Sequence, residues 1–182
     1  MFVREHRPLV RVAPWRYWRD HPKAAWIQEA ETAGRTVEVE HTTVRADAGA
    51  SLAERLGLDV GAEVVQTAYL MRMDGTPVSA SHSWEPAGVP AGTPMEDPHA
   101  GPHADTGIVP RFDAIGYRVS DVREDVSARM PSTEESQRLD IAPGVPLMTV
   151  EQTFYAGGTV VEVADILIPA DRYTLSFRMG IE

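Results

Sequence analysis

The stretch that decides the fold is VVQTAYLMRMDGTPVSASHSWEP, residues Val64 to Pro86, in which two runs of strand-forming residues flank Asp74-Gly75. An Asp-Gly pair favours a two-residue type I′ turn, because both central positions of that turn need a positive φ. The stretch therefore predicts a β-hairpin in which Met73 lies opposite Thr76.

This register would divide the hairpin into a polar and an apolar face. The polar face would carry Arg72, Pro77, Ser79, Ser81 and Ser83. The other face would carry Met73, Met71, Tyr69, Val65, Val78, Ala80, His82 and Trp84. Such a division is typical of an antiparallel sheet that buries one side only.

The hairpin occurs twice in the chain. A displacement of 83 positions, without a gap, matches Arg55-Leu56 with Arg138-Leu139 and Gly75-Thr76 with Gly158-Thr159. A displacement of 82 positions extends the match towards the N-terminus. A fixed register through the same kinds of element indicates a duplicated unit, and the predicted fold is α+β, built from two αβαββ repeats. Chance similarity of two ordinary αβ segments is the alternative.

Composition limits the classes of function. A length of 182 residues suits one domain with a short extension, and a net charge of −10 argues against direct nucleic-acid binding. The absence of cysteine excludes disulfides and thiolate metal sites. We find neither a membrane span nor a signal peptide in the sequence, and we expect a cytoplasmic protein.

The N-terminal residues 1–19 are expected to form an arm that precedes a domain over residues 20–182. Within this region Pro14 to Asp20, PWRYWRD, combines three aromatic residues with two arginines. This segment is either a lid or docking segment, or simply packs on the domain surface. The first helix is expected over His21–Gly34, and the free N–H groups at its start could hold an anionic group.

The other elements follow from alternation and turn residues. They are a strand over Thr36–Ala46, helices over Ser51–Leu58 and Gly107–Gly116, a strand over Tyr117–Arg129, a helix capped by Ser132 and Glu135, a hairpin of Leu147–Ala156 and Thr159–Ile168, and a last strand over Leu175–Met179. Glu124 falls on an apolar strand face, where a carboxylate is costly unless it is paired. It should therefore meet a buried cation or a ligand, or lie at a sheet edge in water.

Recognised catalytic motifs are absent from the sequence, and we expect no enzyme activity, no cofactor and no metal. His99 and His103 have a four-residue spacing but no third ligand nearby, so we interpret them as loop residues. His82 and Asp165 are repeat equivalents and could meet near a two-fold axis. Without a nucleophile, we interpret them as a structural polar pair rather than a catalytic one.

The run from Gly107 to Tyr173 resembles the effector-binding domain of HutC-type, GntR-family transcription regulators, known as the UTRA domain. The supporting motifs are DGTPV at Asp74–Val78, VSARMP at Val126–Pro131, Gly144-Val145-Pro146 and Asp171-Arg172-Tyr173. The resemblance covers about residues 20–180 and implies a chorismate-lyase-like fold with a mostly antiparallel six-stranded sheet. In addition, Phe2 to Glu5 resembles the end of a winged helix-turn-helix domain that this chain lacks.

The resemblance also implies a ligand site over the hairpin. We place there Arg72, Ser79, Ser81, Glu124, Arg129 and Tyr173, together with the helix start at Lys23, Ala24, Ala25 and Trp26. Arg72 would bind an anionic or strongly polar group, unless it is a solvated arginine at the hairpin end. Sugar-phosphate sensors of the family often carry glutamate at the Ser81 position and Arg-Gly at the Pro169-Ala170 position, so this chain departs from a phosphosugar site.

Together these features predict the ligand-sensing domain of a transcriptional regulator, of repressor type. The expected partners are a small-molecule effector, a second copy in a two-fold dimer, and DNA through the absent N-terminal domain only, with no membrane. Two alternatives remain. One is a chorismate-lyase-like enzyme in which Arg72 and Glu124 bind and protonate the substrate. The other is a stand-alone domain that pairs with a partner through a sheet edge.

Overall fold

The computed structural model describes residues 8–12, 14–20, 23–93, 96–97 and 103–177. The proposed remnant of a wing strand, Phe2 to Glu5, and His99 lie outside these residues. In the part of the chain that is described, no helix is both long and apolar enough to cross a membrane.

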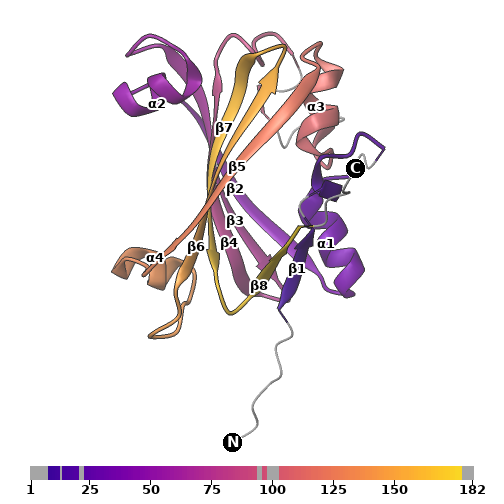
Figure 1. The fold of residues 1–182 in the computed structure, drawn as a ribbon, viewed down its shortest axis with the longest axis vertical. Coiled ribbons are helices and arrows are strands. Elements are labelled where there is room, and N and C mark those ends of the chain that lie inside the picture. The colour runs from indigo at the N-terminus through magenta and orange to yellow at the C-terminus, as the bar shows by residue number, and fades with distance from the viewer. Residues whose placement is uncertain (1–7, 13, 21–22, 94–95, 98–102, 178–182) are drawn as a thin grey trace, which may run out of the picture.

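A six-stranded antiparallel sheet with the strand order β2-β3-β4-β7-β6-β5 forms the centre of the molecule (Figure 1). Its strands are β2 (Val37–Asp47), β3 (Glu63–Met73), β4 (Thr76–Pro86), β5 (Val119–Arg129), β6 (Leu147–Ala156) and β7 (Thr159–Pro169). The predicted α+β fold with a six-stranded antiparallel sheet is confirmed.

Each half of the chain has the order helix, strand, helix, hairpin, as the repeat predicts. The helices are α1 (Ala25–Ala33) and α2 (Ala50–Leu56) in the first half, and α3 (Ile108–Ala114) and α4 (Thr133–Arg138) in the second. The bounds of β2 and β5 differ by 82 residues and those of β4 and β7 by 83, which are the displacements seen in the sequence. The strand order is symmetric about the β4–β7 pair.

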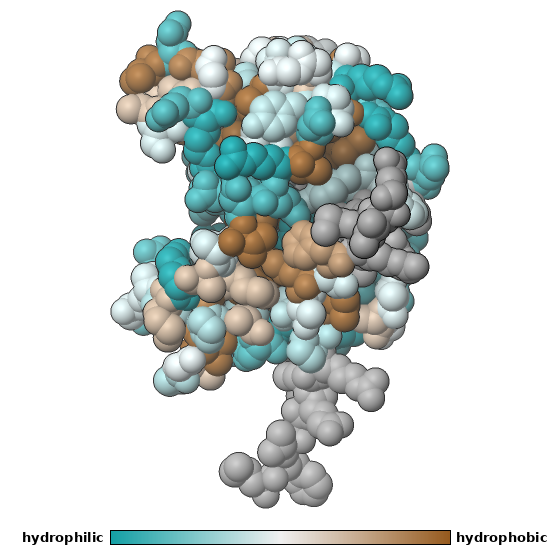
Figure 2. All heavy atoms as spheres, viewed as in Figure 1, coloured by the Kyte–Doolittle hydropathy of each residue, from teal (hydrophilic) through white to brown (hydrophobic). Residues whose placement is uncertain are grey.

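Secondary structure covers the two faces of the sheet differently. Figure 1 shows α1, α3 and a small parallel sheet of β1 (Leu9–Val12) and β8 (Tyr173–Ser176) on one side, which we call the covered face. The short 3-10 helix η1 (Pro14–Tyr17) follows β1. On the other side, α2 and α4 lie at opposite ends of the sheet, and the surface is hollowed between them (Figure 2). We call this side the saddle face.

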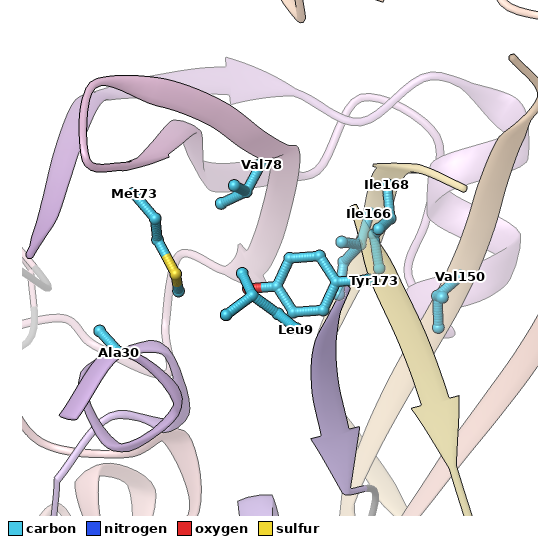
Figure 3. Packing of buried hydrophobic residues seen from close by; sticks show 8 residues of the cluster. All are labelled: Leu9, Ala30, Met73, Val78, Val150, Ile166, Ile168 and Tyr173. Atoms are coloured by element: carbon cyan, nitrogen blue, oxygen red, sulfur yellow. The ribbon is translucent and has the colours of Figure 1, made fainter. Parts of the chain in front are cut away.

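A cluster of buried apolar side chains fixes β1, β8 and α1 to the covered face (Figure 3). Leu9 of β1 and Tyr173 of β8 are only 6% exposed and lie near Met73 and Ile166 of the central sheet. Full burial of such an aliphatic side chain stabilises a fold by about 1.5–3 kcal/mol. The N-terminal arm from Leu9 onward is therefore integrated into the core of the domain.

Two predicted boundaries were wrong for identifiable reasons. Helix α1 begins at Ala25 rather than His21, because Lys23 forms a β-bridge with Thr106 and the Ala24 N–H donates to the carbonyl of Asp105. The helix stops at Gly34 as predicted. The last strand begins at Tyr173 rather than Leu175, because it pairs with β1, which the sequence did not predict.

The hairpin turn was predicted correctly, but its faces were not. Met73 does lie opposite Thr76, and Asp74 and Gly75 have positive φ values. A β-bulge then shifts the register between Met71 and Arg72, so that Met71 rather than Arg72 shares a face with Ser79. One extra residue in a strand reverses the facing of every side chain beyond it, and Ala80, His82 and Trp84 therefore lie on the saddle face.

Candidate functional site

A cavity of about 140 Å³ lies on the covered face, between the central strands and the starts of α1 and α3. The sheet contributes Tyr69, Met71, Ser81, Ser83, Gln152, Phe154, Glu162, Ala164 and Ile166, and the layer above it contributes Arg16, Tyr17, Ala24, Ala25, Trp26, Ala104, Thr106, Gly107, Ile108 and Arg111. An apolar wall with a few polar groups is the usual composition of a small-molecule site.

One arginine and two carboxylates form a buried cluster in the cavity wall. The Nη2 atom of Arg111 lies 3.6 Å from Oε1 of Glu85 and 3.5 Å from Oε2 of Glu162. Burial, followed by the nearby Glu85 charge, raises the pKa of Glu162 well above its usual value. The Glu85 and Glu162 side chains are hydrogen-bonded to each other, and the folded protein holds the proton of Glu162 more tightly than a free carboxyl group does. Arg111 is also hydrogen-bonded with Tyr69, so three strands and α3 meet at this cluster.

A second buried ion pair lies on the α1 side of the cavity. Nε of Arg16, from η1, is 3.4 Å from Oε1 of Glu29 in α1, and the Tyr173 hydroxyl donates to the other Glu29 oxygen at 3.2 Å. Burial raises the pKa of Glu29, and Arg16 opposes that shift. The arm thus contributes a cationic side chain to the cavity, held in place by two elements of the domain.

Glu124 does meet a buried cation, which was the first of its predicted alternatives. Its Oε1 accepts from Nη2 of Arg11 at 3.2 Å and also from the side chains of Tyr17 and Gln152. Tyr17 and Gln152 line the cavity, whereas Glu124 and Arg11 lie behind them. Glu124 therefore orients two cavity-lining groups without lining the cavity itself.

Several buried polar atoms near the cavity are unsatisfied. Among the described residues, Nε and Nη1 of Arg16, Oε1 of Glu29, Nε of Arg111 and Oε2 of Glu162 have no hydrogen-bond partner. Four of these five atoms belong to residues that line the cavity. Because nearly all buried polar groups in proteins are hydrogen-bonded, a cluster of unsatisfied ones indicates a place where a ligand supplies the partners.

Four of the ten predicted site residues line the cavity: Ala24, Ala25 and Trp26 at the start of α1, and Ser81 on β4. The α1 N-cap residue, Ala24, makes no side-chain capping hydrogen bond to the first N–H groups of the helix. Glu124 and Tyr173 contact lining residues or their ion-pair partners. Ser79 is buried on the covered face but does not line the cavity.

The structure does not bring the other three predicted residues into the cavity. Arg72 lies on the saddle face and pairs with Glu40 of β2 at 3.0 Å, whereas the β-bulge, whose extra residue is on β4, turns Ser79 and Ser81 to the covered face. Arg129 ends β5 and binds Glu135 of α4 through two contacts of 2.7 and 2.6 Å. Lys23 is exposed and pairs with Glu31.

Sequence reasoning missed Arg111 and Glu162, and a signal for one of them was present. Glu162 interrupts the apolar strand TVVEVADILIP, so the argument applied to Glu124 would also have identified it. Arg111 follows Pro110 on a short helix and gave no comparable signal. Arg16 and Tyr17 belong to the segment Pro14 to Asp20, which the sequence analysis interpreted either as a lid or docking segment or as a segment that packs on the domain surface.

No group of three or more potential metal ligands occurs within the described ranges. His103 lies in the loop before α3.

Comparisons with known proteins agree on one family. The UTRA domain family matches residues 32–174. An uncharacterized HTH-type transcriptional regulator of Streptomyces coelicolor is 33% identical, over 98% of this chain and 70% of its own length. A crystal structure of a GntR-family transcriptional regulator has a TM-score of 0.83 at 33% identity and covers 100% of this chain and 74% of the other.

A more distant structure shares the fold alone. PhnF from Mycobacterium smegmatis has a TM-score of 0.78 at 18% identity, over 96% of this chain and 73% of its own.

Proposed function

Since the chain belongs to the UTRA domain family of GntR-type transcriptional regulators, we propose that a small metabolite binds in the cavity on the covered face and modulates DNA binding. The DNA-binding unit would be a winged helix-turn-helix domain N-terminal to this one. The observation that carries the proposal is the set of unsatisfied polar atoms of Arg16, Arg111 and Glu162 around a partly apolar cavity.

The position of the arm supports a link between the cavity and a preceding domain. Arg16 and Tyr17 line the cavity, and β1, which leads directly into them, pairs with β8. A ligand that engages either side chain would change the contacts of the arm. A DNA-binding domain attached before residue 8 would therefore be sensitive to occupancy of the cavity.

We extend the proposal to the finer features that the family resemblance suggested. These are a HutC-type subfamily, repression as the mode of regulation, and a cytoplasmic location, where a DNA-binding regulator acts. We propose no catalytic role, since the named relatives are regulators. The cheapest test is the coding sequence upstream of Met1. A winged helix-turn-helix there supports the proposal, and an in-frame stop directly before Met1 contradicts it.

We also propose a homodimer, because a regulator of palindromic operators needs two-fold symmetry. The strands near the C-terminus remain our proposed contact. Sedimentation at tens of micromolar measures the mass directly. A species of twice the 20.0 kDa chain mass supports the dimer, and a 20.0 kDa species alone contradicts it.

The sensor function is tested by a thermal-shift screen of a metabolite library. Ser81→Phe places a ring in the cavity, and His82→Phe is its matched control on the opposite face of the same strand. A true ligand should raise the melting temperature of the wild type and of His82→Phe but not of Ser81→Phe. A library in which no compound distinguishes the two variants would contradict the cavity as the sensing site.

A further inference from the structure

An unsatisfied hydrogen-bond donor and an unsatisfied acceptor lie side by side in the cavity wall. The side chain of Arg111 is 9% exposed and that of Glu162 is 4% exposed. Nε of Arg111 and Oε2 of Glu162 have no hydrogen-bond partner among the described residues, although Nη2 of Arg111 lies only 3.5 Å from that oxygen. The wall therefore presents one donor and one acceptor within the reach of a single small molecule.

The geometry of the cluster does not suit an ion pair whose role is only structural. Stable buried pairs combine close contacts with hydrogen bonds that satisfy the remaining atoms. Here the two Arg111 contacts are 3.5 and 3.6 Å, and one guanidinium serves two carboxyl groups. The second carboxyl group belongs to Glu162, and its pKa is raised by burial and by Glu85. The Glu162 carboxyl group has no cation of its own, because it shares Arg111 with Glu85.

The charges around the cavity favour a ligand that carries a positive group. Arg16 is balanced by Glu29, Arg11 by Glu124, and Arg111 by Glu85. Glu162 is the carboxyl group left over. A phosphate dianion would add negative charge beside Glu85, which is unfavourable at short range in a site of low dielectric constant.

The size of the cavity favours a small ligand. Its volume is about 140 Å³. An apolar cavity of about 150 Å³ accepts a molecule the size of benzene. A compound of amino-acid size suits this space better than a phosphorylated sugar.

We propose that the effector is a small zwitterion of the amino-acid type, with its carboxylate on Arg111 and its ammonium group on Glu162. This inference rests on the sensor function proposed above and specifies the ligand class of the same cavity. The apolar part of the ligand would contact Phe154, Ile166 and Trp26, which line the cavity.

Binding of such a ligand would release a proton. The groups that face Glu162 are Glu85 on β4, Arg111 on α3 and, in the same cluster, Tyr69 on β3. Because burial and Glu85 raise the pKa of Glu162, an ammonium group that pairs with its carboxylate would lower this pKa again and favour transfer of the carboxyl proton to the buffer. The heat of binding should therefore differ between two buffers of different ionisation enthalpy.

The test is calorimetric titration of the whole 182-residue chain with matched probes. The probes are L-amino acids, their N-acetyl derivatives, their methyl esters, inorganic phosphate and glucosamine 6-phosphate. The inference expects at least one amino acid to bind. Its N-acetyl derivative and its ester should each bind about tenfold or more weakly, because each loses one charge-assisted hydrogen bond.

Glu162→Gln and Asp165→Asn form a matched pair of variants. Both neutralise a carboxyl group on β7 that an arginine contacts, but Asp165 lies on the saddle face beside Arg55. Glu162→Gln should weaken amino-acid binding about tenfold or more and abolish proton release, whereas Asp165→Asn should change neither.

Two outcomes would overturn the ligand class. One is that no amino acid binds the wild-type chain. The other is a phosphorylated or uncharged ligand that Ser81→Phe excludes and Glu162→Gln binds normally. In the second case the sensor function stands and only the ligand class fails. In the first case the library screen described above decides whether the cavity is a sensing site at all.

Discussion

His82 on β4 and Asp165 on β7 lie directly opposite each other, and each occupies in its own half the position that the other occupies in the second half. The local two-fold relation between the repeats therefore passes between them. Arg55 of α2 binds Asp165 through two contacts of 3.2 and 2.7 Å. The repeat equivalent of Arg55 is Arg138 of α4, which faces a histidine instead of a carboxylate. The sequence correctly predicted this meeting of His82 and Asp165 as repeat partners.

The His82 side chain should make stability fall in mild acid. Burial, and then the charge of Arg138, lower the pKa of His82 below 6.5 in the folded state. The unfolded chain then binds the proton more readily, so this contribution to stability is complete above pH 6.5 and is lost as the pH falls below it. Urea unfolding of the wild type and of His82→Asn at pH 7.5 and 5.5 measures the effect. His41→Asn, at an exposed histidine of β2, is the control. Equal pH dependence in all three proteins would contradict this prediction.

The contribution of Glu162 to stability should have the opposite pH dependence to that of His82. A carboxyl pKa raised by burial means that the folded state holds the proton more tightly, so the contribution is complete below pH 4.5 and is lost as the pH rises. Glu162→Gln cannot ionise, and its stability relative to the wild type should increase from pH 5 to pH 8. One proton accounts for at most about 1.4 kcal/mol per pH unit. Guanidinium unfolding measures the difference, and Glu151→Gln, at an exposed position of β6, controls for loss of a charge. A constant difference across this range would disprove the assignment.

Replacement of Arg172 should destabilise the protein more than replacement of Arg72. The Arg172 guanidinium donates to the carbonyl oxygens of Pro77, Leu139 and Asp140, and ties the two halves together. Its replacement by alanine should cost about 2–4 kcal/mol, since three carbonyls lose a charged donor. Arg72→Ala removes only the partly exposed pair with Glu40 and should cost less than about 1 kcal/mol.

The Arg72→Ala variant also tests the proposal that the ligand site is the cavity on the covered face. Arg72→Ala should leave ligand affinity unchanged, since Arg72 lies on the saddle face. Ligand titration measures the affinity, and chemical unfolding measures the stability. A loss of affinity in Arg72→Ala would restore the hairpin site that the sequence suggested.

Helix capping differs between the repeats at a single equivalent position. Ser132 caps α4 in a complete capping box with Glu135, whereas the equivalent N-cap of α2 is Gly49, which has no side-chain cap. Ser132→Ala should cost about 1 kcal/mol. Gly49→Ser should stabilise by about 0.5 kcal/mol, because Gly49 has extended backbone and nothing lies within 4 Å of an added Cβ. Thermal unfolding measures both, and a loss of stability in Gly49→Ser would contradict the equivalence.

Much of the fold could be predicted because its determinants are local. The Asp74-Gly75 and Gly157-Gly158 turns, the Ser132 cap and the repeat displacement all appear within short stretches of sequence. The β-bulge at Arg72 could not be predicted in this way. It changes no residue type, and only the pairing of two whole strands reveals it.

The candidate site was predicted only where one segment provides it. The start of α1, with Ala24 to Trp26, was identified, because helix ends are marked in the sequence. The Arg111 cluster joins α3 to β4 and β7, and Arg16 meets Glu29 across separate elements. Contacts of this kind depend on tertiary packing, which residue spacing alone does not contain.

The parallel pairing of β1 with β8 limits how a signal can leave the cavity. Main-chain hydrogen bonds fix a register from Leu9 opposite Tyr173 to Val12 opposite Ser176. A strand moves past its neighbour in steps of about 3.3 Å per residue, so β1 cannot slide by a small amount without breaking these bonds. A small movement of η1 that leaves these bonds intact would therefore move β1 and β8 together. A domain attached before residue 8 would therefore rotate about the β1–β8 pair and would not slide along it.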